Sequence, residues 1–192
     1  MTTKLVLDFG SGISTYKPLL NEKVISIDFN KKMKPTVAHD LNKFPYPFPK
    51  NYFDKIYASH IIEHLKDTVR AMEELYRIAK PNASVIVRVP HFSSKDAWGN
   101  ITHYRPFASF TFDLLDKNNK EHRGENYGNC NFQILKREIH YTNPNMRHSF
   151  LIRIVSRFLD LLANKNQKFC ERFWCYWVGG FFEVYFILKV VK

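Results

Sequence analysis

The chain has 192 residues, of which 45% are hydrophobic, and its mean hydropathy is −0.34. This length suits one hydrophobic core and is short for two domains. Its three cysteines, Cys130, Cys170 and Cys175, are too few for the disulfide framework of a small secreted scaffold. The apolar run at 5–7 is too short for a signal peptide, so we expect a cytoplasmic protein. A net charge of +11 leaves anionic partners open, including nucleic acid and lipid.

Short apolar runs alternate with polar connections through the first half of the chain. They predict strands near 4–8, 23–28, 35–38, 53–58 and 84–89, with a periodic helix from about 67 to 80. Such alternation implies parallel crossovers, and therefore an α/β sheet.

The second half is predicted to hold a helix around 106–117, a strand at 132–141, an amphipathic helix at 147–163 and a last strand at 183–191. The stretch 173–191 is the most membrane-like part of the chain. Glu183 and the pair Gly179-Gly180 interrupt it, so we expect no spanning helix, and contact with a membrane surface stays open.

Two of the predicted strands end in carboxylates. The first ends in Asp8 and passes at once into a turn with Gly10 and Gly12, and the second ends in Asp28, sixteen residues after Gly12. Parallel strands meet at one edge of a sheet, where a nucleotide-like ligand can lie against bare backbone. Asp28 suits a ribose diol, Phe29 can cover an adenine face, and Asp8 would attract a cationic ligand.

Phosphate is a poor fit to the same turn. A dinucleotide motif has a third glycine where this chain has Thr15, and Asp8 would repel a pyrophosphate. The P-loop pattern is absent as well. The pattern therefore favours a nucleoside that carries a positive charge.

The run at 4–12 resembles motif I of the class I S-adenosylmethionine-dependent methyltransferases, of the small-molecule, type 11-like kind. Asp28 matches the acid that ends the second strand of that family, and Asp40-Leu41-Asn42 resembles its third-strand loop. The segments 51–65 and 74–90 resemble its fourth strand with the following turn, and its helix with the fifth strand. Asn82-Ala83 stands where the family usually has two glycines, which should alter only that turn.

The resemblance implies a Rossmann-like methyltransferase sheet of about seven strands, mostly parallel with an antiparallel last strand, and helices on both faces. It implies S-adenosyl-L-methionine as the cofactor. The residues expected to bind it are Asp8, Phe9, Gly10, Ser11, Gly12, Asp28, Phe29, Asp40, Leu41, Ser59, His60 and His64.

Residues 1–192 are expected to form a single methyltransferase domain. In the resembled fold the last two strands form a hairpin, so 142–182 is an insertion here. We expect 91–131 and 142–182 to cover the substrate, unless a partner subunit does so.

Methyl transfer is an in-line displacement that mainly requires alignment and exclusion of water, and some acceptors also need a base. The loop after the fifth strand offers candidates, with His91 first as a general base and His103 second. A histidine hydrogen-bonded to loop backbone is the alternative for His91. The run His103-Tyr104-Arg105 could bind an anionic substrate or form an ordinary solvated turn, and Ser93 and Asp96 lie in the same loop.

The run from His60 to His64 also spells H-x-x-E-H, the inverted zinc-protease motif. It lies at a strand-to-helix junction beside a cofactor loop, so we predict no metal there. Glu63 and His64 are expected to brace the cofactor pocket or to cap backbone groups.

The predicted function is methyl transfer to a small or lipid-like metabolite. Ala58-Ser59-His60 lacks the signature associated with methylation of exocyclic base nitrogens. Residues 117–172 hold eleven Lys/Arg against five Asp/Glu, so an RNA methyltransferase is an alternative. A module that binds S-adenosylmethionine without catalysis is another, and the oligomeric state stays open.

Overall fold

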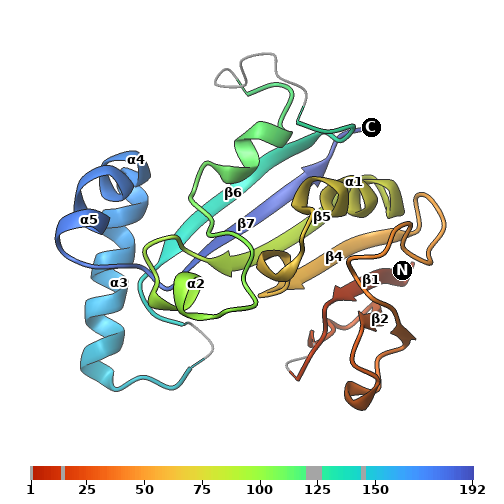
Figure 1. Cartoon of the computed structure of the whole chain (residues 1–192), viewed down its shortest axis with the longest axis horizontal. Coiled ribbons are helices and arrows are strands. Elements are labelled where there is room, and N and C mark those ends of the chain that lie inside the picture. Colours follow the sequence, from red (N-terminus) through yellow and green to blue (C-terminus); the bar gives the residue numbers. More distant parts are fainter. Residues whose placement is uncertain (1, 14–15, 120–126, 144–145) are drawn as a thin grey trace.

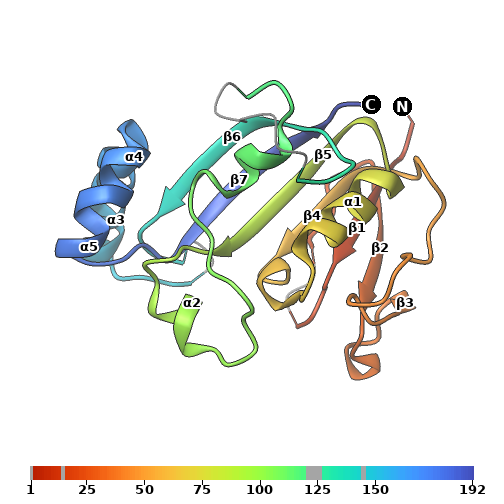
Figure 2. The same cartoon turned by 45° about the horizontal axis from the view of Figure 1, so that its top comes forward.

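The computed structural model describes residues 2–13, 16–119, 127–143 and 146–192. Thr15 of the glycine turn and parts of both predicted insertions, 120–126 and 144–145, lie outside these residues. Seven strands form one sheet in the order β3-β2-β1-β4-β5-β7-β6, and Figures 1 and 2 show that it is twisted. The strands are β1 (Lys4–Phe9), β2 (Glu22–Asp28), β3 (Val37–Ala38), β4 (Phe53–Ser59), β5 (Ala79–Pro90), β6 (Phe132–His140) and β7 (Glu183–Val190).

The strand directions confirm the predicted α/β fold. Neighbours among the first five strands are parallel, and β7 runs antiparallel to both β5 and β6. The carboxyl ends of β1, β2, β4 and β5 therefore meet at one edge, together with the amino end of β7. Ligands of such sheets bind at that carboxyl edge.

The helices are short except for two. The α-helices are α1 (Thr68–Ile78), α2 (Lys95–Gly99), α3 (Phe150–Lys165), α4 (Gln167–Phe169) and α5 (Cys175–Trp177). In the described part of the chain there are also three 3-10 helices and one π-helix: η1 (Lys31–Met33), η2 (Ile62–His64), η3 (Thr111–Leu115) and η4 (Cys170–Trp174). The helix expected around 106–117 is reduced to η3. The sequence analysis missed α2, because five residues are too few for a period to emerge.

The core lies on one face of the sheet. Val85, Val87 and Val89 of β5 are fully buried, whereas the alternate residues Ile86 and Arg88 are only partly buried. The buried face is covered by α1 and η3, which lie on the same side of the sheet in both views (Figures 1 and 2). Alternating burial of this kind is expected where one face of a sheet packs on a core.

The described helices leave the opposite face uncovered, although the sequence predicted helices on both faces. The connection from β1 to β2 spans only 10–21 and contains Pro18, which leaves little room for a helix across the sheet. A polar network occupies part of this face instead. Lys55 forms an ion pair with Glu22, and Tyr16 donates to Glu22 at 2.8 Å.

The turn at Asn82-Ala83 in β5 contains a left-handed residue although it has no glycine. Asn82 adopts a left-handed backbone with φ of +63°, and the register between β4 and β5 shifts beside it. Asparagine tolerates this conformation better than most residues. The departure Asn82-Ala83 is therefore accommodated within the turn.

The segment between β6 and β7 forms a helical extension, defined here as 150–178, beyond the end of β6 (Figure 1). A small second core of Ile139, Ala163, Cys170 and Phe181 joins the extension to the sheet. Asn164 reinforces the joint, because its side chain pairs with both backbone groups of Ile139 at 2.8 Å. Among the described residues, none of the helices has the length and apolarity that crossing a bilayer requires.

Phe186 of β7 tests the one-sided core. It is fully buried and meets Phe112 of η3 edge-on, with ring centroids 4.9 Å apart. We expect Phe186→Ala to lower the free energy of unfolding by about 3–5 kcal/mol, measured by urea denaturation. Leu135→Ala on β6, where the side chain is 54% exposed, should change it by less than about 0.5 kcal/mol. Equal effects of the two substitutions would contradict this account of the core.

Candidate functional site

The turn after β1 depends on its glycines. Gly10 and Gly12 have φ of +72° and +47°, in the region that favours glycine. A Cβ on Gly10 would lie 2.3 Å from the side chain of Ile61, which follows β4. Around Gly12 such an atom would meet nothing closer than the carbonyl oxygen of Gly10, at 3.9 Å. The turn thus packs tightly against Ile61 and leaves bare backbone open at Gly12.

The two strand-ending carboxylates lie beside this turn. Asp28 is only 5% exposed, and its two oxygens accept hydrogen bonds from the backbone N–H groups of Gly12 (2.9 Å) and Asn30 (2.8 Å). Because a carboxylate has about four acceptor sites, each oxygen keeps one for a ligand hydroxyl. Burial raises the pKa of Asp8, the N–H of Tyr16 acts against this, and the charge of Asp28 adds to the rise. A cation bound near Asp8 would relieve this unfavourable charge.

A hollow adjoins the ends of β2 and β3. Phe29 and Asp40 line it together with Ala38 and His39, and Phe29 is 71% exposed. Leu41 is buried in the core, and its carbonyl oxygen accepts a hydrogen bond from Tyr46 at 3.1 Å. The structure therefore brings Phe29 and Asp40 to one hollow, which Leu41 does not line.

Ser59 and His60 end β4 at the same edge. His60 has an uncommon left-handed backbone, with φ of +53°. Its Nε2 lies 3.1 Å from Glu183 and its Nδ1 lies 3.4 Å from Glu63. Burial lowers the pKa of His60, but these two carboxylates outweigh it and raise the pKa to about 9. Arg88 also pairs with Glu183, at 2.6 Å. Glu183 was not predicted as a site residue from the sequence. Its position as a lone acid in an otherwise apolar strand could have indicated a buried charged partner.

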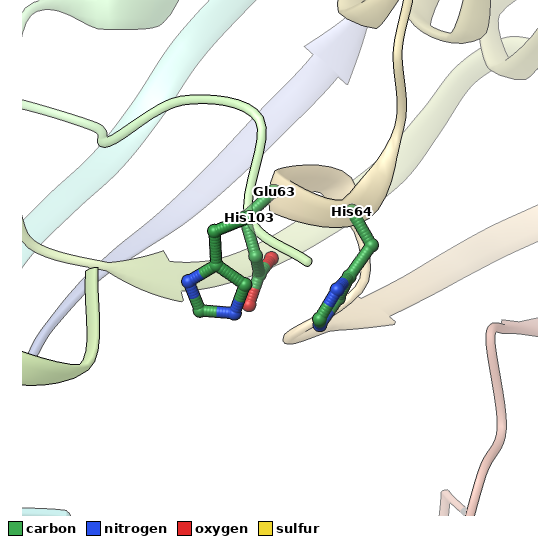
Figure 3. Close-up of side chains that lie close together, drawn as sticks. All are labelled: Glu63, His64 and His103. Carbon is green, nitrogen blue, oxygen red and sulfur yellow. The ribbon is translucent and has the colours of Figure 1, made fainter. Parts of the chain in front are cut away.

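His103, from the loop after α2, lies close to the turn that follows β4. Figure 3 shows Glu63, His64 and His103 side by side, and one potential ligand atom of each lies within 4.8 Å of the others. The rings of His64 and His103 meet edge-on, 4.6 Å apart. The loop that carries His103 is fastened to η2, because Tyr104 donates its N–H to the carbonyl of Glu63 at 2.8 Å. Nearby, Arg105 donates to the carbonyl of Lys66 at 3.2 Å.

His91 lies apart from this group. Its side chain is fully buried, with Nδ1 2.6 Å from Ser93 Oγ and Nε2 3.1 Å from Glu171 Oε1. Glu171, on η4, also accepts from the N–H (2.6 Å) and the hydroxyl (3.0 Å) of Ser109. Nδ1 also accepts the backbone N–H of Ser93 at 3.3 Å, so both ring nitrogens have hydrogen-bond partners. Asp96 lies on α2, and its N–H bonds to the hydroxyl of Ser94.

Comparison with known proteins finds a methyltransferase domain in the first half of the chain. Residues 7–87 match the family model Methyltransf_11, described as a methyltransferase domain. The match covers less than half of the chain and identifies a methyltransferase domain in this part of it. Its cofactor is S-adenosylmethionine, and the open glycine turn with two adjoining carboxylates fits a cationic nucleoside. No curated protein matches the chain.

Solved structures agree on the fold. A SAM-dependent methyltransferase from Archaeoglobus fulgidus is 19% identical, with a TM-score of 0.56 over 97% of this chain and 86% of that one. A putative methyltransferase in complex with the Trm112 activator from Haloferax volcanii is 12% identical, with a TM-score of 0.60 over 100% and 84%. The [4+2]-cyclase SpnF is 14% identical, with a TM-score of 0.57 over 99% and 76%. The name of the last shows that this fold alone does not determine the reaction.

We expect Asp28→Ala to weaken S-adenosylmethionine binding by about 1–3 kcal/mol, because the ribose hydroxyls lose their acceptor. Isothermal titration calorimetry measures the affinity, and Asp28→Asn should give a smaller loss. Asp116→Ala is the matched control, because Asp116 likewise accepts from the N–H two residues on, at 3.0 Å, but lies at the end of η3. Unchanged affinity in Asp28→Ala would contradict the assigned pocket.

Glu171 predicts a pH dependence of stability. Burial raises its pKa, but the bonds from His91 and Ser109 outweigh this and hold the pKa below its ordinary 4.5. The ionised carboxylate therefore contributes stability that is complete above pH 4.5 and is lost as the pH falls through the lowered value. Glu171→Gln should cost about 1–3 kcal/mol near neutral pH and flatten the acid decline, measured by urea denaturation at each pH.

Glu138→Gln is the control for Glu171. Glu138 pairs with Lys136 at 2.9 Å on the surface, where such a pair is worth at most about 1 kcal/mol. The same acid decline in Glu171→Gln as in the native chain would refute the role assigned to Glu171.

Proposed function

We propose that this chain transfers the methyl group of S-adenosylmethionine to a small, lipid-like acceptor. In the displacement, a lone pair of the acceptor atom forms the new bond to the methyl carbon, and the carbon–sulfur bond breaks toward sulfur. The sulfur leaves as a neutral thioether, so no acid is needed to expel it. The chain then has to align the two molecules and keep water out.

The proposed cofactor contacts follow the geometry of the carboxyl edge. Asp28 would hold the ribose hydroxyls, and Phe29 and Asp40 would contact the adenine. The turn would receive the amino-acid part of the cofactor, with Asp8 beside its positive charges. The remaining contacts are assigned to residues at the same edge or beneath it: Phe9, Gly10, Ser11, Gly12, Leu41, Ser59, His60 and His64.

We assign the acceptor side to the described parts of 91–131 and 142–182. These two segments contact each other closely at the carboxyl edge. Phe181 donates its N–H to Ser93 Oγ at 3.0 Å, and a Cβ on Gly180 would lie 1.7 Å from the carbonyl oxygen of Ser93. Of the two predicted catalytic histidines, His103 is partly exposed and His91 is fully buried. Contact with the acceptor is therefore assigned to His103.

One observation carries the choice of a lipid-like acceptor: the helical extension exposes a large apolar face. Leu151 is 73% exposed and Trp177 is 85% exposed. The other large exposed apolar side chains of the extension are Phe150, Ile152, Ile154, Val155, Phe158, Leu161, Leu162, Phe169, Phe173, Tyr176 and Val178. The stripe that the sequence identified as amphipathic thus faces outward. A monomeric soluble protein seldom leaves so many neighbouring apolar side chains uncovered.

Charge indicates what the apolar face contacts. Exposed arginines and lysines flank it: Arg147, Arg153, Arg157, Lys165, Lys168 and Arg172. A helix with apolar and aromatic residues on one side and basic residues on the other is typical of binding to the surface of an anionic membrane. The extension also encloses an apolar hollow of about 240 Å³, lined by Leu162, Phe169, Trp174 and Phe181 among others. We therefore assign this face to a membrane surface, from which the acceptor is taken.

Vesicle binding tests the membrane assignment. The native chain should sediment with vesicles of phosphatidylcholine and phosphatidylglycerol and much less with phosphatidylcholine alone. Phe158→Asp should weaken this binding by at least about tenfold, since a buried large apolar side chain is worth roughly 1.5–3 kcal/mol. Leu20→Asp, at a side chain that is 94% exposed outside the extension, is the matched control and should bind like the native chain.

Two further outcomes separate the other functions. If the chain bound RNA with an affinity that fell steeply with salt concentration, and did not bind vesicles, RNA would be the acceptor instead of a lipid-like molecule. Tight binding of S-adenosylmethionine, with no S-adenosylhomocysteine formed from lipid extracts or water-soluble metabolites, would refute catalysis and favour a module that only binds the cofactor.

A further inference from the structure

Glu63 is a buried carboxylate with too few partners. Its side chain is 1% exposed, and neither of its oxygens has a hydrogen-bond partner. The nearest cationic group is the ring of His60, whose Nδ1 lies 3.4 Å from Oε1. His103 also has a buried atom without a hydrogen-bond partner, its Nδ1, and His103 lies close to Glu63 and His64. Buried polar groups normally have partners, because leaving one unpaired costs free energy.

These unpartnered atoms converge with His64. In Figure 3 the carboxylate of Glu63 lies against the ring of His103, with His64 across from them. One ligand atom from each residue lies within 4.8 Å of the others. Three ligands that each lie about 2.0–2.2 Å from one metal ion can be at most about 3.8 Å from one another. Side-chain movements of about 1 Å would therefore close the cluster around one ion.

We propose that Glu63, His64 and His103 bind a divalent transition-metal ion. Two imidazole nitrogens and one carboxylate oxygen suit Zn²⁺, Mn²⁺, Fe²⁺ or Co²⁺, whereas Mg²⁺ and Ca²⁺ prefer oxygen ligands alone. This assignment departs from the sequence analysis, which predicted no metal. The H-x-x-E-H run supplies two of the ligands, and the third comes from a loop that the sequence does not connect with it.

The hydrogen bonds around His64 prepare it as a ligand. Its Nδ1 lies 2.9 Å from Thr102 Oγ1, and the hydroxyl of Thr102 donates to Asn100 Oδ1 at 2.7 Å. The N–H of Thr102 donates to the same oxygen, which supports its assignment as an acceptor. The proton between His64 and Thr102 is therefore on Nδ1, and Nε2 keeps a free lone pair. Metal-binding histidines usually donate their other N–H in this way.

The position of the cluster indicates what the ion would do. η2 directly follows Ile61, which touches Gly10 in the cofactor turn, and His103 lies in the loop assigned to the acceptor. Three protein ligands leave coordination positions open, as in catalytic metal sites. The ion would hold an oxygen atom of the acceptor beside the cofactor. His103 would then act on the acceptor as a ligand of that ion. This role rests on the proposed function, whereas the binding of the ion does not.

Metal titration of the untagged chain tests the site. After treatment with a chelator and its removal, Zn²⁺, Mn²⁺ and Co²⁺ are added in separate calorimetric titrations. The native chain should bind one ion per molecule. His103→Ala and Glu63→Gln should each weaken binding by more than about tenfold, the lower end of the losses seen even for residues behind the ligands. His148→Ala is the control, because His148 bonds to the carbonyl of Asn143, outside the cluster.

Each outcome of the titration is informative. Absence of binding for all three ions, or equal binding by the native chain and all three variants, would overturn the site. Circular dichroism establishes that the variants fold, and His103→Ala, a half-buried loop position, keeps the test valid if Glu63→Gln does not fold. Ion binding with turnover unaffected by the chelator would overturn only the role toward the acceptor. Ion binding without any methyl transfer would refute the proposed function and leave the metal site standing.

Discussion

The close contact between Gly10 and Ile61 is the constraint on which the site depends. It joins the turn after β1 to the segment after β4, two neighbouring strands whose pairing ends at Phe9 and Ala58. Any side chain at position 10 would push the two apart. With the contact in place, the cofactor turn lies directly beside η2, so the cofactor residues and the cluster at Glu63 share one edge of the sheet.

The placement of the candidate cofactor residues at one edge of the sheet could be predicted from the sequence, because it depends on strand ends. Asp8 and Asp28 close apolar runs, and parallel strands bring such residues together whatever the loops between them do. Phe29 directly follows Asp28 at the end of β2, and Asp40 lies by the same rule just after the neighbouring strand β3. Gly10 and Gly12 could be assigned to a ligand-binding turn for a related reason. A turn without side chains beside a carboxylate lets a ligand approach the backbone closely.

The acceptor side could not be predicted in the same way, because it depends on contacts between distant loops. His103 meets Glu63 only through the path of the loop after α2, and Glu171 reaches His91 from a helix eighty residues away. The spacing of apolar residues in α3 identifies the apolar face of this helix. It does not say whether the sheet or a partner covers that face, and in this structure the sheet does not cover it.

The attachment of the helical extension has a mechanical consequence. Glu171 of the extension accepts hydrogen bonds from Ser109 and pairs with His91 in the loop at the carboxyl edge, and Gly180, which follows the extension, lies against Ser93 of the same loop. A displacement of the helices relative to the sheet would therefore also displace the loop that contains His91, Ser93 and Ser109.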